Sequence, residues 1–152
     1  MEATFTSVDP RDPDAQTAPW RYLSEVSARV VNGVLSTADL AVDDFLPPRG
    51  TFLLGRLGES VVGCGAVRAL DEEIGEIKRM WIDPGFRGRG FGGLLLTALQ
   101  DAARDLGYRI VRLDTNDVLV EAIRLYEAHG FRRIDRYNVN PDPTRFYEKS
   151  LS

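Results

Sequence analysis

The 152-residue chain contains one cysteine, Cys64, and one histidine, His129. A single cysteine allows neither an intrachain disulfide nor a cysteine metal cluster, so we expect no metal and a reducing compartment, the cytoplasm. Cys64 stands between two glycines in a valine-rich run, which favours a small buried residue over a nucleophile. A Ser-His-Asp triad would have to use His129, and the chain lacks the Gly-x-Ser-x-Gly turn that would present a serine to it.

Long hydrophobic runs and an excess of positive charge are also missing. The uncharged run 91–100 is about half of the roughly 18–20 residues that span a bilayer. The N-terminal residues have neither the basic region nor the apolar core of a signal peptide. Nineteen basic residues against 23 acidic ones give a net charge of −4, without the clustered positive charge of a nucleic-acid surface. We therefore expect neither a membrane nor a nucleic acid as partner.

The composition fits one globular domain, with 43% hydrophobic and 28% charged residues. After a possible strand at Ala3–Val8, the proline-rich residues up to 19 are interpreted as a mobile connection. Apolar residues at three- and four-residue spacing then predict a helix from Trp20. A second short helix is predicted at Ser36–Asp43, and Pro47 to Gly50 form a firm break.

The rest of the chain alternates strand-like and helical patterns. Gly58-Glu59 separates two strand-like runs, which predicts a β-hairpin. The predicted strands are Thr51–Leu57, Ser60–Ala69, Gly75–Ile82, Tyr108–Asp114, Arg132–Asn138 and Arg145–Leu151, and the helices run from about Gly90 to Leu106 and from an Asn116 or Asp117 cap to His129. This order predicts an α/β (mixed α+β) fold with one mixed, mostly antiparallel, twisted sheet and helices on both faces.

The glycine-rich segment 85–93 precedes the first of these two helices. Such a turn presents free backbone N–H groups and the positive end of the helix dipole, which together can cradle a diphosphate. Gly88-x-Gly90-x-x-Gly93 formally matches the dinucleotide fingerprint, and Asp114 ends the next strand where a ribose-binding acid would sit. However, residues 83–87 intervene between strand and turn, and too few elements follow for a doubly wound domain. A glycine-rich loop with solvated arginines is the third interpretation.

A second pattern in the same segment is more specific. Arg87-x-x-Gly90-x-Gly92 follows a strand and an Asp-Pro pair, and the later run 122–131 reads Ala-Ile-Arg-Leu-Tyr-Glu-Ala-His-Gly-Phe. Together these resemble the GNAT superfamily of acetyl-CoA-dependent N-acyltransferases, most strongly from Glu76 to Phe131. The resemblance implies a GNAT-type domain at 20–152, with 1–19 as an N-terminal strand and connection of the same domain. We expect a monomer or homodimer.

The resemblance implies how acetyl-CoA is bound and how its thiol departs. The strand before the turn would splay from its neighbour, so that its main chain binds the pantetheine arm, and the turn would hold the pyrophosphate. The cofactor-binding residues implied are Met80, Trp81, Ile82, Arg87, Gly88, Arg89, Gly90, Phe91, Gly92 and Gly93. Tyr126 would protonate the departing thiolate, since a phenol of pKa about 10 is a reasonable acid for it. Without the resemblance, an aromatic residue on an amphipathic helix is more often part of the core.

Glu76 is the second catalytic candidate. It stands where many family members carry a glutamate, and it could accept a proton from the substrate ammonium, directly or through water. Strict alternation would place Glu76, Lys78 and Met80 on one face of the strand, with Ile77 and Arg79 on the other. The competing interpretation is an exposed carboxylate paired with Lys78 or an arginine.

Asn116 marks a departure from the family pattern. Many members have an asparagine three residues before the Ala-Ile pair, where this chain has Leu119. Asn116 either contacts the pantetheine from a remodelled helix start or caps the helix, and we expect capping. The sequence thus predicts transfer of an acetyl group from acetyl-CoA to a primary amine of a small molecule or peptide, by direct attack in a ternary complex. The alternatives are a nicotinamide-dinucleotide oxidoreductase and a non-catalytic CoA-binding module.

Overall fold

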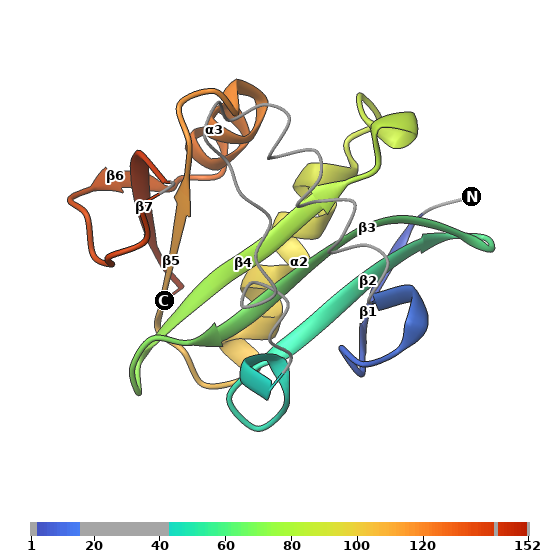
Figure 1. Cartoon of the computed structure of the whole chain (residues 1–152), viewed down its shortest axis with the longest axis horizontal. Coiled ribbons are helices and arrows are strands. Elements are labelled where there is room, and N and C mark those ends of the chain that lie inside the picture. Colours follow the sequence, from blue (N-terminus) through green and yellow to red (C-terminus); the bar gives the residue numbers. More distant parts are fainter. Residues whose placement is uncertain (1–2, 16–42, 142, 152) are drawn as a thin grey trace.

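The computed structural model describes residues 3–15, 43–141 and 143–151. Its strands form one seven-stranded sheet in the order β1-β2-β3-β4-β5-β7-β6 (Figure 1). The strands are β1 Thr4–Val8, β2 Thr51–Leu57, β3 Ser60–Ala69, β4 Ile74–Ile82, β5 Ile110–Thr115, β6 Arg132–Ile134 and β7 Arg145–Ser150. Only β4 and β5 run parallel, and the other neighbouring pairs are antiparallel. The predicted mixed, mostly antiparallel sheet is confirmed.

Two α-helices and two short 3₁₀ helices lie wholly within the described ranges. They are η2 Asp43–Phe45, η3 Pro84–Phe86, α2 Phe91–Asp105 and α3 Val120–Ala128. α2 buries Leu95, Leu96 and Leu99 on one stripe, as their three- and four-residue spacing dictates. Figure 1 shows α2 lying across the strands at the centre of the sheet. The two helices predicted from Trp20 and at Ser36–Asp43 fall almost entirely outside the described residues.

The sheet has an apolar cluster on each face. α2 and α3 pack with the sheet in the larger cluster, which includes Ile77, Val111, Leu113 and Tyr147. The opposite face carries the smaller cluster Ala15, Phe45, Phe52, Leu54, Cys64, Ala66 and Trp81. We call these the helix face and the opposite face. Because Ala15 is buried here and Asp14 accepts a hydrogen bond from Arg56, the segment 9–15 is packed in part against the sheet.

A β-bulge interrupts β4 and corrects the predicted alternation. Cys64 pairs with Trp81 but Ala66 pairs with Lys78, so two β4 residues stand opposite one on β3. Arg79, one of these two, has a φ of 57°. The extra residue inverts the phase, so Met80 packs on the helix face together with Ile77. Glu76 and Lys78 lie on the opposite face and do not share a face with Met80.

Two predicted boundaries are also wrong. β6 ends at Ile134 and does not reach Asn138, because residues 136–138 direct their side chains to hydrogen-bond partners elsewhere. α3 begins at Val120 with Leu119 in the cap position and no side-chain cap. Asn116 instead closes a turn before the helix, its side chain accepting a hydrogen bond from the Val118 N–H at 3.1 Å.

Candidate active site

The strands β4 and β5 diverge after a short stretch of pairing. Their registered pairs run from Ile74↔Ile110 to Glu76↔Arg112 and stop there, although β4 continues to Ile82 and β5 to Thr115. Beyond Glu76, β4 keeps β3 as its paired strand, and β5 keeps β7. The edge of β4 that faces β5 is therefore available to an extended ligand that needs main-chain hydrogen bonds. This divergence of β4 from β5 is the splay that the family resemblance implies for the strand before the glycine turn.

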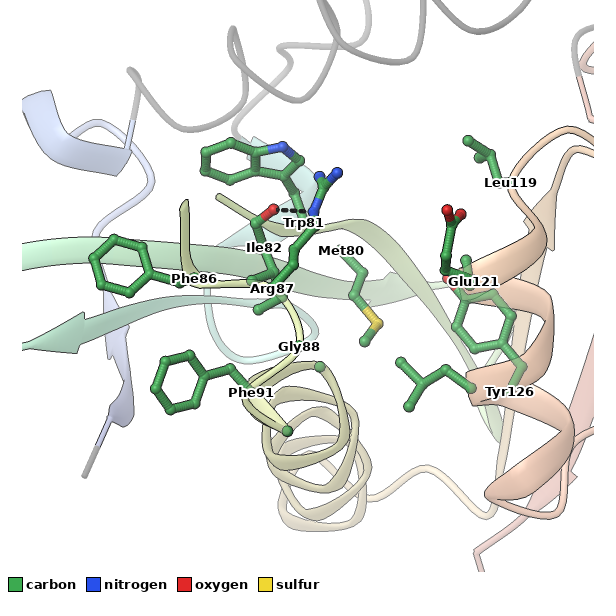
Figure 2. A pocket seen from close by; sticks show the side chains of 14 residues that line it. Met80, Trp81, Ile82, Phe86, Arg87, Gly88, Phe91, Leu119, Glu121 and Tyr126 are labelled. Carbon is green, nitrogen blue, oxygen red and sulfur yellow. Dashed lines mark hydrogen bonds between the residues drawn. The ribbon is translucent and has the colours of Figure 1, made fainter. Parts of the chain in front are cut away.

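A cavity of about 530 Å³ opens between the end of β4, the start of α2 and α3 (Figure 2). Nine of the sequence-predicted site residues line it: Met80, Trp81, Ile82, Arg87, Gly88, Gly90, Phe91, Gly92 and Tyr126. Residues predicted from two distant parts of the sequence, the glycine turn and the Leu-Tyr helix, thus form the walls of one space. Arg89, Gly93, Asn116 and Glu76 are not among its lining residues.

The turn between η3 and α2 is shaped by Gly88 and Gly90, whose φ values are +79° and +82°. A Cβ on either would meet no atom within 4 Å, so backbone conformation and not crowding demands glycine here. The open space above the turn lets an anion approach the first N–H groups of α2. Arg87 donates from Nε to the Ile82 carbonyl at 2.9 Å, which places its guanidinium at the end of β4 (Figure 2).

The next two glycines serve a different purpose. A Cβ on Gly92 would lie 3.2 Å from a Leu125 methyl group, and one on Gly93 would lie 3.4 Å from the His129 ring. Both glycines therefore allow α2 to approach α3 closely, and Gly93 does so without reaching the cavity. Arg89 places its guanidinium carbon 5.4 Å from the centre of the Phe86 ring, at the rim of the turn.

Tyr126 both packs in the core and borders the cavity. Its side chain is buried, and its ring centre lies 6.0 Å from those of Phe131 and Tyr147. Figure 2 shows the ring beside Glu121 on the α3 side of the cavity, across from Met80 and Arg87. The aromatic contacts hold the ring in place, so its hydroxyl has a fixed position relative to the cavity. The packing interpretation and the catalytic one are thus compatible.

Glu76 lies on the opposite face and is fully buried, so the competing interpretation is wrong about its exposure and right about its pairing with an arginine. Oε1 accepts a hydrogen bond from Arg68 Nε at 2.8 Å, and Oε2 accepts one from the Tyr137 hydroxyl at 2.5 Å. Burial and the neighbouring Glu76 carboxylate raise the pKa of Tyr137 far above its usual range, so this hydroxyl stays protonated and donates. Both carboxylate oxygens of Glu76 are therefore engaged.

Five cavity residues were absent from the sequence prediction: Phe86, Leu119, Glu121, Ala122 and Leu125. Ala122 could have been found, because the residue four before Tyr126 shares its helix face. Leu125 directly precedes Tyr126 in the Leu-Tyr pair and carries no such spacing. Leu119 occupies the position of the family asparagine and gives the cavity an apolar side chain there. Glu121 carried no sequence signal, since an acidic residue in the first turn of a helix is ordinary.

The described residues offer little support for a cysteine nucleophile, a metal site or a dinucleotide domain. Burial raises the pKa of Cys64 to about 12, which keeps the thiol protonated and confirms it as a core residue. No group of three or more His, Cys, Asp or Glu side chains in the described ranges could hold a metal ion. No helix among these residues is long and apolar enough to cross a membrane. A sheet with one parallel pair also lacks the architecture of a doubly wound dinucleotide domain.

Comparison with known proteins agrees with this geometry. The acetyltransferase (GNAT) family matches residues 15–131, more than half of the chain. An IAA acetyltransferase from Azospirillum brasilense is 36% identical over 135 residues, covering 86% of this chain and 84% of its own. A Klebsiella pneumoniae protein assigned to the acyl-CoA N-acyltransferases is 30% identical, with a TM-score of 0.79 over 99% of this chain and 98% of that one.

One further solved structure shares the fold. A GNAT family acetyltransferase from Elizabethkingia anophelis with acetyl-CoA bound is 18% identical, with a TM-score of 0.73 over 97% of each chain. The dinucleotide oxidoreductase alternative has no support in these comparisons. By its family match, its relatives and its fold, the chain belongs to the acetyltransferase (GNAT) family and is an acetyltransferase.

Proposed function

We propose that the chain transfers an acetyl group from acetyl-CoA to a primary amine of a small molecule or peptide, by direct attack in a ternary complex. The observation that carries the proposal is that the Gly88–Gly90 turn, the diverging edge of β4 and Tyr126 border the same cavity. The anion-binding turn suits a diphosphate, and the main-chain edge suits the amide groups of a pantetheine arm. The phenol suits a departing thiolate that needs a proton.

The residues of the cavity fit the donor. The α2 N–H groups behind the glycine turn would hold the pyrophosphate, with Arg87 contributing charge. The main chain of Met80 to Ile82 would hydrogen-bond the pantetheine arm, and the apolar side chains of Ala122 and Leu125 would pack against it. Asn116 lies in a turn outside the cavity lining, which supports its role as a turn-closing residue over a contact with the donor. When bound, acetyl-CoA supplies the acyl group as an activated thioester.

Tyr126 would act as the general acid. The amine nitrogen bonds to the thioester carbonyl carbon, the carbon–sulfur bond breaks, and the sulfur takes the phenol proton. The tyrosyl oxygen then regains a proton from solvent or from the amine. Tyr126 lines the cavity and its ring packs against Tyr147, and this packing supports a fixed position of the phenol during the transfer.

Glu76 is proposed to accept the proton that the substrate ammonium must lose, since only the neutral amine attacks. Its burial on the opposite face, with Arg68 and Tyr137 on its two oxygens, requires this proton to travel through water or a hydroxyl. Tyr137 and Arg68 are both only half-buried, so either side chain could connect the buried carboxylate to solvent. The same contacts support a second role, in which Glu76 anchors the segment after β6 to the sheet.

A cytoplasmic location and a monomer or homodimer complete the proposal. The single, buried and protonated thiol of Cys64 supports a reducing compartment. Size-exclusion chromatography with light scattering tests the oligomeric state.

The decisive experiment is a panel of primary amines incubated with acetyl-CoA, read by release of free CoA thiol. Turnover of at least one amine class above the enzyme-free rate is expected, and Tyr126→Phe serves as the matched protein control. Tight binding of acetyl-CoA without turnover of any amine would instead support the non-catalytic binding module. Calorimetry compares the binding of NAD with that of CoA, and binding of NAD in place of CoA would overturn the donor assignment.

A further inference from the structure

An ion pair bridges β4 and β5 at the point where their main chains part. The last backbone pair is Glu76↔Arg112, and two residues further along each strand stand Lys78 and Asp114. Lys78 Nζ lies 3.3 Å and 3.5 Å from the two carboxylate oxygens of Asp114. Both side chains lie on the opposite face, because their neighbours Ile77 and Leu113 pack on the helix face. The pair therefore spans the gap between the strands from the side away from the cavity.

Asp114 is held more firmly than Lys78. Asn138, on the segment after β6, donates from Nδ2 to Asp114 Oδ2 at 2.7 Å. The Asp114 side chain is 9% exposed, whereas that of Lys78 is 22% exposed. The distances from Lys78 are at the long end of the hydrogen-bond range. An oriented carboxylate thus faces a loosely held and accessible ammonium group.

Two neighbouring arginines on this face are committed to other anions. Arg68 donates to the buried Glu76, and Arg112 donates to Glu148, which Arg132 also contacts. Arg68 Nε lies 2.8 Å from Glu76 Oε1, and Arg112 Nε lies 2.9 Å from Glu148 Oε1, so each arginine has one ion pair of good geometry. Of Arg68, Lys78 and Arg112, Lys78 has the longest contact with its anion and can therefore change partner most easily.

We infer that Lys78 and Asp114 recognise the acceptor, and that the acceptor is a small amine that also carries a carboxylate close to the amine, as an α-amino acid does. The inference rests on the acetyl transfer proposed above. The acceptor carboxylate binds Lys78 and its ammonium group binds Asp114, so one internal ion pair is exchanged for two intermolecular ones. The amine nitrogen is then held at the gap through which an acyl group in the cavity is reached.

The exchange also predicts that an amine without a carboxylate is a poorer acceptor. An amine without a carboxylate would occupy Asp114 and take away the partner of Lys78. That would leave a half-buried cation uncompensated, which is costly. A carboxylate-bearing acceptor leaves no charge unpaired, and the site therefore selects for zwitterions.

The test compares acceptors that differ only in the second charge: α-amino acids, their carboxamides and the corresponding decarboxylated amines. The readout is kcat/KM from CoA thiol release, taken as the ratio of acid to carboxamide. We expect the wild type to prefer the amino acid, and Lys78→Met to lower that ratio by at least about tenfold through KM, the usual effect of losing a charged hydrogen bond. Lys78→Arg should restore part of it. Arg109→Met removes an exposed cation that lies apart from this pair, and should leave the ratio unchanged.

Each outcome decides between the proposals. Equal turnover of amino acids and carboxamides by the wild type would overturn the zwitterion assignment while leaving acetyl transfer intact. An unchanged ratio in folded Lys78→Met would overturn the role of Lys78. If the ion pair is purely structural, Lys78→Met should lower the melting temperature and reduce kcat/KM for all acceptors alike, with no change in the ratio. No CoA release from any acceptor would instead count against the acetyl transfer itself.

Discussion

The two faces of the sheet around the diverging strands β4 and β5 differ in whether main chain or side chains form the site. On the helix face, the site consists mainly of main chain: a glycine turn with positive φ angles, the edge of β4 and the start of α2. On the opposite face, it consists of charged side chains in contact, Arg68 with Glu76 and Lys78 with Asp114. A main-chain site suits a constant ligand such as a nucleotide donor, whereas side chains can be exchanged to suit different acceptors.

The largest effect is expected when one hydroxyl group is removed from the site on the helix face. Tyr126→Phe should lower kcat by roughly 10²–10³, because general acid catalysis is typically worth about 10²–10⁴. The Kd for acetyl-CoA should stay within a few-fold, since phenylalanine keeps the ring contacts with Phe131 and Tyr147. Steady-state and single-turnover rates are both needed, because slow product release can hide a chemical defect. Normal single-turnover chemistry in the folded variant would end the general-acid assignment.

The next effect concerns donor binding at the turn. Gly90→Glu places an anion where the pyrophosphate is proposed to lie, and should weaken acetyl-CoA binding by about 2–4 kcal/mol. Gly107→Glu is the matched control, because Gly107 also has a positive φ of 97° and no atom within 4 Å of a built Cβ. Calorimetry should show loss of binding in the first variant only. Similar affinities in the two folded variants would contradict the assignment of the turn.

On the opposite face, Glu76→Gln should slow the reaction mainly at neutral pH and less at pH 9. Near the pKa of the substrate amine the neutral form is plentiful, so a base matters less there. Glu148→Gln is a suitable control, because Glu148 is also a buried carboxylate between two arginines. A loss of equal size at both pH values would mean that Glu76 acts as an anchor for Tyr137 and not as a proton acceptor.

The contrast between the faces also explains what the sequence could predict. The glycine turn and the Leu-Tyr helix are local patterns, and the structure brings both to one cavity. The bulge at Arg79 could not be predicted, because it depends on the pairing of β3 with β4. Neither could the partners of Glu76 or Asp114, since Tyr137 lies 61 residues from the first and Asn138 lies 24 from the second. Contacts across such separations leave no periodic signal.

The smallest effect is expected at Cys64, on the same opposite face. Its pKa of about 12 in the folded protein exceeds the roughly 8.5 of an exposed thiol. The stabilisation from the protonated thiol is fully present below pH of about 8.5 and is lost as the pH rises through 12. Iodoacetamide at pH 8 should label Cys64 slowly in the native protein and rapidly in urea. Rapid labelling of the native protein would contradict its burial.

The central claim, that the donor binds to main chain on the helix face, can be tested by following backbone amide resonances of ¹⁵N-labelled protein during titration with acetyl-CoA. The account predicts the largest shifts at Gly88, Gly90 and Gly92 and along Met80 to Ile82, with much smaller shifts at Arg68, Glu76 and Asp114. Shifts concentrated on Arg68, Glu76 and Asp114, with the glycine turn unaffected, would contradict it.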